Sequence, residues 1–175
     1  MEFDLQPSLR GSLMELRPLR REDFDALFQA ASDPLIWEQH PEHDRYKREV
    51  FQRYFDGAIE SKGAFAIVHL ESGKIIGSSR YCNFNPEKQE IEIGWTFLER
   101  AFWGGTYNRE LKTLMLDHAF RFVPRVVFRV GETNLRSQKA LQKLGARLVD
   151  GIDVPPSGGT SNRHLIFVIS RQGTD

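Results

Sequence analysis

Hydrophobic and polar residues change their spacing several times along the chain, and each change marks an expected element. The alternating stretch 13–17 predicts a short strand. Two amphipathic helices are expected next, one that opens at Arg21 and ends before Pro34, and one over 46–61. The middle then alternates with a period of two. Stretches 64–70, 74–81 and 90–97 therefore predict three antiparallel strands in a meander, with Gly73 in the first turn.

The last third returns to helical spacing between strands. Helices are expected over 108–122 and 134–144, and strands over 125–130, 146–150 and 163–170. The predicted order is β-α-α-β-β-β-α-β-α-β-β, which is typical of an α/β fold with a mixed, mostly antiparallel central sheet flanked by helices. No linker divides the chain, so 1–175 is expected to form a single domain. Residues 1–12 lack periodicity and predict a loose N-terminal arm.

Composition narrows the class of protein. The chain has 175 residues, of which 40% are hydrophobic, and this is enough apolar material for a core. Its 24 basic and 24 acidic side chains cancel, which argues against a histone-like nucleic-acid binder. One cysteine excludes an intrachain disulfide and a cysteine-based zinc site. Without a long apolar run or a signal peptide, the sequence predicts a soluble, cytoplasmic protein with no nucleic-acid or membrane partner.

A glycine-bearing loop, Phe102-Trp-Gly-Gly-Thr-Tyr-Asn108, joins a predicted strand to a predicted helix. Gly104 and Gly105 carry no Cβ that could block close approach to the helix N-terminus. Free backbone N–H groups and the positive end of the helix dipole make such a place suitable for a phosphate group. An ordinary tight connection would also use glycine. The loop lacks the Gly-Lys-Ser/Thr of a Walker A motif and the G-x-G-x-x-G of a dinucleotide site.

Several segments occur in a recognisable order. They are Leu16-Arg-Pro-Leu19 with Glu22-Asp23-Phe24, Ile75-Ile-Gly77, Glu92-Ile-Gly-Trp95, Trp103-Gly-Gly-Thr-Tyr-Asn108 with Glu110, and Asn134-x-x-Ser137 with Lys143-Leu-Gly145. By these segments the chain, from about Leu13 to Ser170, resembles the GCN5-related N-acetyltransferases (GNAT). Within that family it resembles the branch that acetylates ribosomal-protein N-termini. The resemblance implies a GNAT-like sheet that is split at its middle.

The resemblance also implies a reaction. Acetyl-CoA would be the co-substrate, no metal would be needed, and a primary amine would attack directly. The amine could belong to a protein N-terminus, a polyamine or an aminoglycoside-like molecule. A CoA-binding module without turnover is the alternative, because many relatives carry a tyrosine where this chain has Leu141. The sequence does not fix the oligomeric state, and a homodimer stays open.

The resemblance assigns cofactor contacts residue by residue. The pantetheine arm would pair with the strand segment 95–98, and the pyrophosphate would meet the glycine loop. The implied cofactor-binding residues are Trp95, Phe97, Leu98, Gly104, Gly105, Thr106, Tyr107, Asn108, Asn134 and Ser137. Thr106 replaces the second glycine of the family's Gly-x-Gly, and Asn108 replaces a small alanine.

Two residues are candidates for the chemistry. Glu92 alternates opposite Ile91 and Ile93, so its carboxylate is expected near the cleft with a raised pKa, as general base. The alternative for Glu92 is a cross-strand ion pair with a basic neighbour such as Arg80. Ser137 could hydrogen-bond the departing thiolate, or it could simply cap its helix.

Acceptor loops are expected in the segments 33–46 and 151–162, and the candidate acceptor contacts come from the first of them. Trp37, His40 and Glu92 are expected to bind the substrate, although Trp37 could equally be structural. His40 and His43 have no further ligands at suitable spacing, so no metal site is predicted. Charge also divides along the chain, because residues 100–147 carry ten basic and three acidic side chains. That segment holds both cofactor motifs and suits a polyanionic cofactor, whereas the acidic remainder suits a cationic amine.

Overall fold

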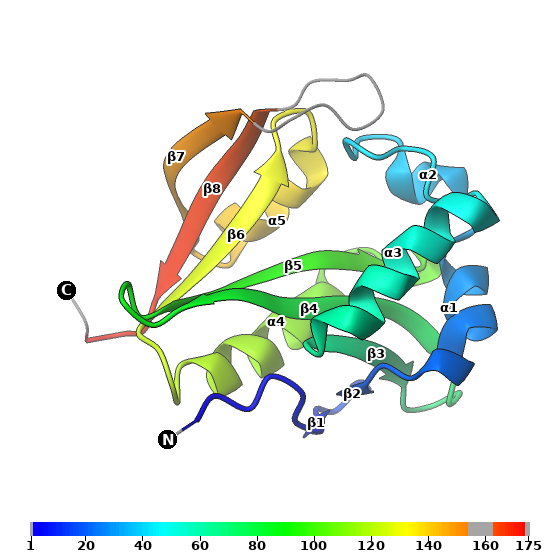
Figure 1. Cartoon of the computed structure of the whole chain (residues 1–175), viewed down its shortest axis with the longest axis horizontal. Coiled ribbons are helices and arrows are strands. Elements are labelled where there is room, and N and C mark those ends of the chain that lie inside the picture. The colour runs from blue at the N-terminus through cyan, green and yellow to red at the C-terminus, as the bar shows by residue number, and fades with distance from the viewer. Residues whose placement is uncertain (1, 154–162, 174–175) are drawn as a thin grey trace.

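One sheet of eight strands organises the computed structural model, which describes residues 2–153 and 163–173 (Figure 1). The strand order is β1-β2-β3-β4-β5-β6-β8-β7. The strands are β1 (Leu9–Arg10), β2 (Met14–Pro18), β3 (Ala64–His69), β4 (Ile75–Asn85), β5 (Glu90–Leu98), β6 (Arg125–Gly131), β7 (Arg147–Asp153) and β8 (Arg163–Ser170). Only β5 and β6 pair in parallel. The predicted mixed, mostly antiparallel sheet is therefore confirmed.

Helices cover both faces of the sheet. They are α1 (Phe24–Ala31), α2 (Pro34–Trp37), α3 (Arg48–Ser61), α4 (Thr106–Ala119) and α5 (Leu135–Lys143), with 3₁₀ turns at Arg21–Asp23 and Arg100–Phe102. The apolar side of α4 packs with Ile91 and Ile93 of β5 in one hydrophobic cluster. The apolar sides of α1 and α3 pack with Phe97 in a second cluster. The sheet thus separates two cores, and α4 lies opposite α1 and α3 (Figure 1).

The N-terminal arm is not loose, so that prediction is wrong. β1 pairs with β2, and Phe3 stacks on Phe122 with ring centroids 4.7 Å apart. The Glu110 carboxylate on α4 accepts hydrogen bonds from the backbone N–H groups of Ser12, Leu13 and Met14. These partners lie about a hundred residues away in the sequence, and local periodicity therefore carries no sign of them.

The sheet opens between its two parallel strands. β5 pairs with β6 only through Glu90–Arg125, Ile91–Val126 and Glu92–Val127. Beyond Glu92 the strands diverge, and Figure 1 shows β6, β8 and β7 turning away from β5 as a separate wing. The split that the family resemblance implied is confirmed. It leaves one edge of the second half of β5 without a strand partner.

A β-bulge interrupts β5 at the same level. Ser78 pairs with Phe97 and Arg80 pairs with Gly94, so Ser79 alone faces both Trp95 and Thr96. Trp95 has φ +56°, which is rare for a bulky side chain. The bulge reverses the alternation of β5: Ile91 and Ile93 point to the α4 side, and Phe97 points to the α3 side. The period-two alternation of 90–97 would place Ile91, Ile93, Trp95 and Phe97 on one face; the bulge breaks this arrangement, and Trp95 is 45% exposed.

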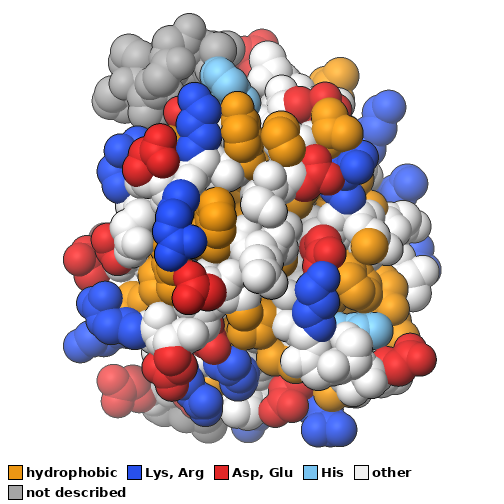
Figure 2. Space-filling model, turned by 90° about the vertical axis from the view of Figure 1, so that its right-hand side faces the viewer, with side chains coloured by type: hydrophobic (Ala, Val, Ile, Leu, Met, Phe, Trp, Pro, Cys, Tyr) orange, Lys and Arg blue, Asp and Glu red, His pale blue; other side chains and the backbone are white. Residues whose placement is uncertain are grey.

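The surface seen beyond α1, α2 and α3 carries acidic and basic side chains side by side (Figure 2). On this face, therefore, no extended area carries charges of only one sign. None of the helices among the described residues is long and apolar enough to span a membrane.

Candidate active site

A cleft of about 740 Å³ occupies the opening between β5 and β6. Most of the predicted cofactor contacts line it, together with both of the predicted acceptor residues other than Glu92. The predicted residues in its wall are Trp37, His40, Trp95, Phe97, Leu98, Gly104, Gly105, Asn108, Asn134 and Ser137. The fold therefore brings together segments that are far apart in sequence.

The glycine loop forms one end of the cleft. Gly104 and Gly105 have φ of +120° and +101°, and a Cβ on either would meet no atom within 4 Å. Gly105 is the N-cap of α4, and the Arg109 N–H makes an early helical bond to its carbonyl at 2.9 Å. The N–H groups of the preceding residues 106–108 lie at the helix end, where backbone donors have no partner in the helix itself. This end of the cleft suits an anion without a specific side chain.

Thr106 and Tyr107 were predicted as cofactor contacts, but they are not among the residues that line the cleft. Neither side chain belongs to the cleft wall. Tyr107 instead packs on Phe102, with ring centroids 5.0 Å apart, and its hydroxyl lies 3.3 Å from His69 Nε2. The side chains at these two positions therefore do not supply the predicted contacts, and only their main-chain N–H groups at the start of α4 stay candidates.

Two carbonyls of the predicted pantetheine-binding segment already have partners. The Trp103 indole N–H donates to the Leu98 carbonyl at 2.9 Å. The Tyr54 hydroxyl donates to the Trp95 carbonyl at 2.6 Å. A ligand along this edge of β5 would therefore find these two oxygens engaged, and the remaining main-chain groups of residues 95–98 are its candidate partners.

Asn134 and Ser137 stand at the start of α5. Asn134 Oδ1 accepts the Ser137 backbone N–H at 3.3 Å and so caps the helix. The cap is thus the asparagine side chain, and among the described residues the Ser137 hydroxyl has no hydrogen-bond partner. Both residues line the cleft, as does Leu141 one turn further along.

Glu92 is buried beside the cleft rather than in its wall. The residue is 7% exposed, and its Oε2 accepts from Asn83 Nδ2 at 2.6 Å and lies 3.4 Å from Arg129 Nε. A cross-strand ion pair is therefore present, and its basic partner is Arg129 of β6 rather than Arg80. Burial raises the pKa of Glu92, and Asn83 and Arg129 offset this in part. The other oxygen, Oε1, lies 3.6 Å from where a Cβ on Gly94 would be, and Gly94 lines the cleft.

Trp37 at the end of α2 and His40 just after it lie in the wall of the cleft. Trp37 is only 2% exposed, donates its indole N–H to Ala31, and belongs to the α3-side core. His40 Nδ1 accepts the Glu42 backbone N–H at 3.0 Å. Burial, with the nearby charges of Arg45 and His164, lowers the pKa of His40 to about 3, so its imidazole is neutral at pH 7. Both residues can shape the cleft, and neither carries charge to a ligand.

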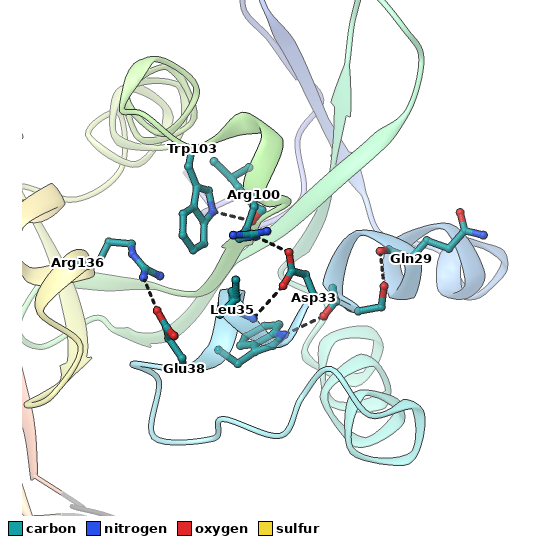
Figure 3. Close-up of polar contacts among 11 residues, drawn as sticks. Gln29, Asp33, Leu35, Glu38, Arg100, Trp103 and Arg136 are labelled. Carbon is teal, nitrogen blue, oxygen red and sulfur yellow. Dashed lines mark hydrogen bonds and ion pairs between the residues drawn. The ribbon is translucent and has the colours of Figure 1, made fainter.

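Polar bridges hold the α2 segment against both sides of the cleft (Figure 3). Asp33, the N-cap of α2, binds Arg100 at the end of β5. Glu38, just after α2, pairs with Arg136 of α5 at 3.4 Å. The Arg136 guanidinium also stacks over the Trp103 ring, 4.1 Å from its centroid. Trp103 and Arg136 thus meet across the cleft, between the glycine loop and α5.

The charged side chains of the cleft are mostly basic. The basic groups in its wall are Arg109, Lys112, Arg129, Arg136, Lys139 and Lys143, and Glu42 is the acidic one. All six basic residues fall within 100–147, the segment whose sequence carries the excess of positive charge. The cradle at the glycines and this charge fit a ligand with a pyrophosphate, as CoA has.

Sequence reasoning missed Lys112. It lies on α4 one turn after Asn108, and its side chain turns into the cleft, where the residue is 6% exposed. Its Nζ donates to Thr96 Oγ1 at 3.0 Å. The available signal was a lysine among the apolar positions Leu111 and Met115 of an amphipathic helix.

A second, smaller pocket of about 330 Å³ shares Trp95, Pro41 and Glu42 with the cleft. Its other walls are His43, Asp44, Val50, Arg53 and Tyr54. The pocket falls in the segment 33–46, where an acceptor site is expected. Part of the other expected acceptor segment, 154–162, lies outside the described residues. Among the described residues, no group of His, Cys, Asp and Glu side chains is arranged to hold a metal ion.

Comparison with known proteins identifies the family. The family model of the acetyltransferase (GNAT) domain matches residues 14–147. The chain therefore belongs to the GNAT acetyltransferases, and it is an acyltransferase that uses acetyl-CoA as acetyl donor. No curated protein matches the chain.

Solved structures share the fold at low sequence identity. A GCN5-related N-acetyltransferase from Brucella melitensis matches with a TM-score of 0.84 and 21% identity over 94% of this chain and 79% of that one. RimJ from Mycobacterium smegmatis, in complex with CoA-disulfide, matches with a TM-score of 0.71 and 20% identity over 96% and 88%. A ribosomal-protein-S5-alanine acetyltransferase from Vibrio fischeri matches with a TM-score of 0.72 and 17% identity over 97% and 100%. At these identities the likeness concerns the fold.

Proposed function

We propose that this protein transfers the acetyl group of acetyl-CoA to a primary amine by direct attack, without a covalent enzyme intermediate. The observation that carries the proposal is the single cleft where β5 and β6 part. It joins an anion-binding loop at one end to the β5 bulge, beside which the smaller pocket opens. A long anionic donor and a separate acceptor can therefore meet at Trp95.

The acceptor is proposed to enter through the smaller pocket. Asp44 gives this pocket a carboxylate that suits an ammonium group, beside Glu42, which pairs with Arg45, and Trp95 links the pocket to the cleft. A protein N-terminus is the acceptor class that we place first, since ribosomal-protein acetyltransferases are among the proteins of similar fold. Polyamines and aminoglycoside-like amines are the other acceptors to test.

Glu92 is proposed as the general base, acting through Oε1. Burial raises the pKa of Glu92, which makes its carboxylate a stronger base. Both of its close partners bind Oε2. Gly94 carries no side chain to cover the other oxygen, so a water molecule in the cleft could relay the proton from the amine. Ser137 is proposed to contact the sulfur end of the donor.

The test pairs a binding measurement with a turnover measurement. Calorimetry should show acetyl-CoA binding, and a free-thiol assay should show CoA release with a peptide that has a free N-terminus. The same peptide with a blocked N-terminus and no other amine is the matched control. Spermidine and an aminoglycoside form the remaining arms. Binding without release in every arm would leave a CoA-binding module and contradict the transferase proposal.

A further inference from the structure

Lys112 places an ammonium group inside the cleft, next to the strand where the thioester is expected. Its Nζ donates to Thr96 Oγ1, and that hydroxyl is 2.7 Å from Ser79 Oγ. Thr96 belongs to the bulge that includes Trp95. The side chain also approaches β6, with Nζ 5.9 Å from the centre of the Phe128 ring. Lys112 therefore touches both strands that bound the opening.

This ammonium has no counter-charge in the part of the chain that the structure describes. No ion pair there includes Lys112. An ammonium has three N–H donors, and one of them goes to Thr96. Burying a charge without an anion is costly, and an apolar side chain of the same length would fill this space at less cost. Such a group points to a bound ligand that carries or develops negative charge.

The charged side chains near Lys112 in the cleft are also basic. Arg109 lies one turn away on α4, Arg129 is on β6, and Lys139 and Lys143 line the cleft from α5. Among these groups only Arg129 is paired, with the buried Glu92. The nearby charges therefore do not neutralise the ammonium. Burial alone lowers the pKa of Lys112, to about 8, so the group can lose and regain a proton near neutral pH.

We infer that Lys112 is the proton donor to the thiolate that leaves in acetyl transfer. This rests on the proposed function. The amine nitrogen forms its bond to the carbonyl carbon, the carbon–sulfur bond breaks, and its electron pair goes to sulfur. A proton passes from Nζ to that sulfur and leaves Lys112 neutral. The amine proton goes to Glu92, directly or through water, and Lys112 regains a proton from solvent.

The inference answers a gap in the site. Leu141 of α5 lines the cleft, and its apolar side chain offers no proton. Leu141, Ser137 and Lys112 all line the same cleft, from α5 and α4 respectively. The proton donor is thus supplied by α4, which starts at the glycine loop, rather than by α5.

The experiment compares wild type with Lys112→Met, which keeps the length of the side chain and removes its charge. The first readout is binding of CoA and of desulfo-CoA across pH, with ultraviolet absorbance reporting thiolate on the bound CoA. Beside an ammonium, the bound thiol should ionise at lower pH in wild type than in Lys112→Met. Lys88→Met, in the exposed β4–β5 turn and outside the cleft wall, should leave that thiol titration as in wild type.

Kinetics give the second readout. In Lys112→Met, kcat/KM should fall by about 10²-fold or more, the contribution typical of a general acid, and the basic limb of the wild-type pH profile should disappear. Lys112→Arg, which keeps the charge but does not release a proton near neutral pH, should recover the thiol shift but not the rate. Circular dichroism verifies folding, and the Arg variant serves if the Met variant does not fold.

Identical thiol titrations in wild type and Lys112→Met, with both ligands bound, would overturn the inference and leave the transferase proposal standing. Failure of wild type to bind either ligand would instead overturn the proposed function.

Discussion

The hydroxyl of Tyr54 on α3 donates a 2.6 Å hydrogen bond to the backbone carbonyl of Trp95 on β5. This bond ties a helix of one core to the bulge that stands at the meeting point of the two pockets. The guanidinium of Arg80 stacks over the Trp95 ring, 4.4 Å from its centroid, and the guanidinium of Arg45 lies 5.2 Å from the same centroid. The unusual φ of Trp95 is therefore held by several contacts at once, as expected for strain at a functional site.

Removing that bond should loosen the bulge. Tyr54→Phe keeps the aromatic packing but leaves the Trp95 carbonyl without its hydrogen-bond donor. The free energy of unfolding should therefore fall by about 1–3 kcal/mol. We also expect kcat/KM to fall by about tenfold while the affinity for acetyl-CoA changes little, because the bulge positions reacting groups. Chemical denaturation and steady-state kinetics measure both. Tyr46→Phe is the matched control, and an equal loss of activity in it would contradict the role of Tyr54.

Glu92→Gln should slow turnover without weakening acetyl-CoA binding. A base must be ionised, and burial raises the pKa of Glu92, so the wild-type rate should fall as pH drops through that raised value. The variant should lose this acid limb together with about 10²-fold or more in kcat/KM. Glu90→Gln on the same strand is the control, because Glu90 pairs with Arg125 instead. A variant with the wild-type pH profile would remove Glu92 as base.

Arg136→Met should weaken binding of acetyl-CoA by about tenfold, which corresponds to about 1.4 kcal/mol. The change removes both the stack on Trp103 and a positive charge from the cleft wall. Because charge is part of the effect, the difference from wild type should shrink at high salt. Calorimetry at two ionic strengths measures it. Arg125→Met, on the far side of the parallel pairing, should bind like wild type, and a similar loss there would indicate a general charge effect.

Glu110 should make stability depend on pH. Burial opposes its ionisation, but hydrogen bonds from Ser12, Leu13 and Met14 outweigh it, so the pKa of Glu110 is lowered. The carboxylate therefore stabilises the fold above the pKa of the unfolded chain, and this contribution is lost as pH falls through the lowered value. Glu110→Gln should unfold more easily than wild type at pH 7, and the difference should shrink in acid. Glu87→Gln, in the exposed β4–β5 turn, should show no such difference at pH 7.

Sequence periodicity predicted the elements well where they are long. The strand 90–97 and the helix 134–144 fall close to β5 and α5, and Gly73 has the positive φ expected of the hairpin turn. Short elements escaped, because α2 has four residues and β1 two, fewer than any repeat needs. The bulge escaped as well, since one inserted residue changes the face of Phe97 without a mark in the pattern.

The residues of the site were likewise predicted only in part. Gly104, Asn134 and Ser137 were predicted from motifs, and the fold brings them to one cleft. The partners of Glu92 were not predictable, because Arg129 reaches it from β6 only through the parallel pairing of β5 and β6. Lys112 was hidden for a related reason: a lysine on a helix is normally solvated, and only the opening of the sheet places its ammonium inside.

The most direct test of acetyl transfer in this cleft is a single-turnover mass measurement. The protein is mixed with acetyl-CoA whose acetyl group carries an isotope label, and with a peptide that has a free N-terminus. The account predicts that the label appears on the peptide α-amine while the mass of the protein stays unchanged throughout. A labelled protein during turnover would contradict direct attack. Label that stays on bound acetyl-CoA with every amine would contradict acetyl transfer itself.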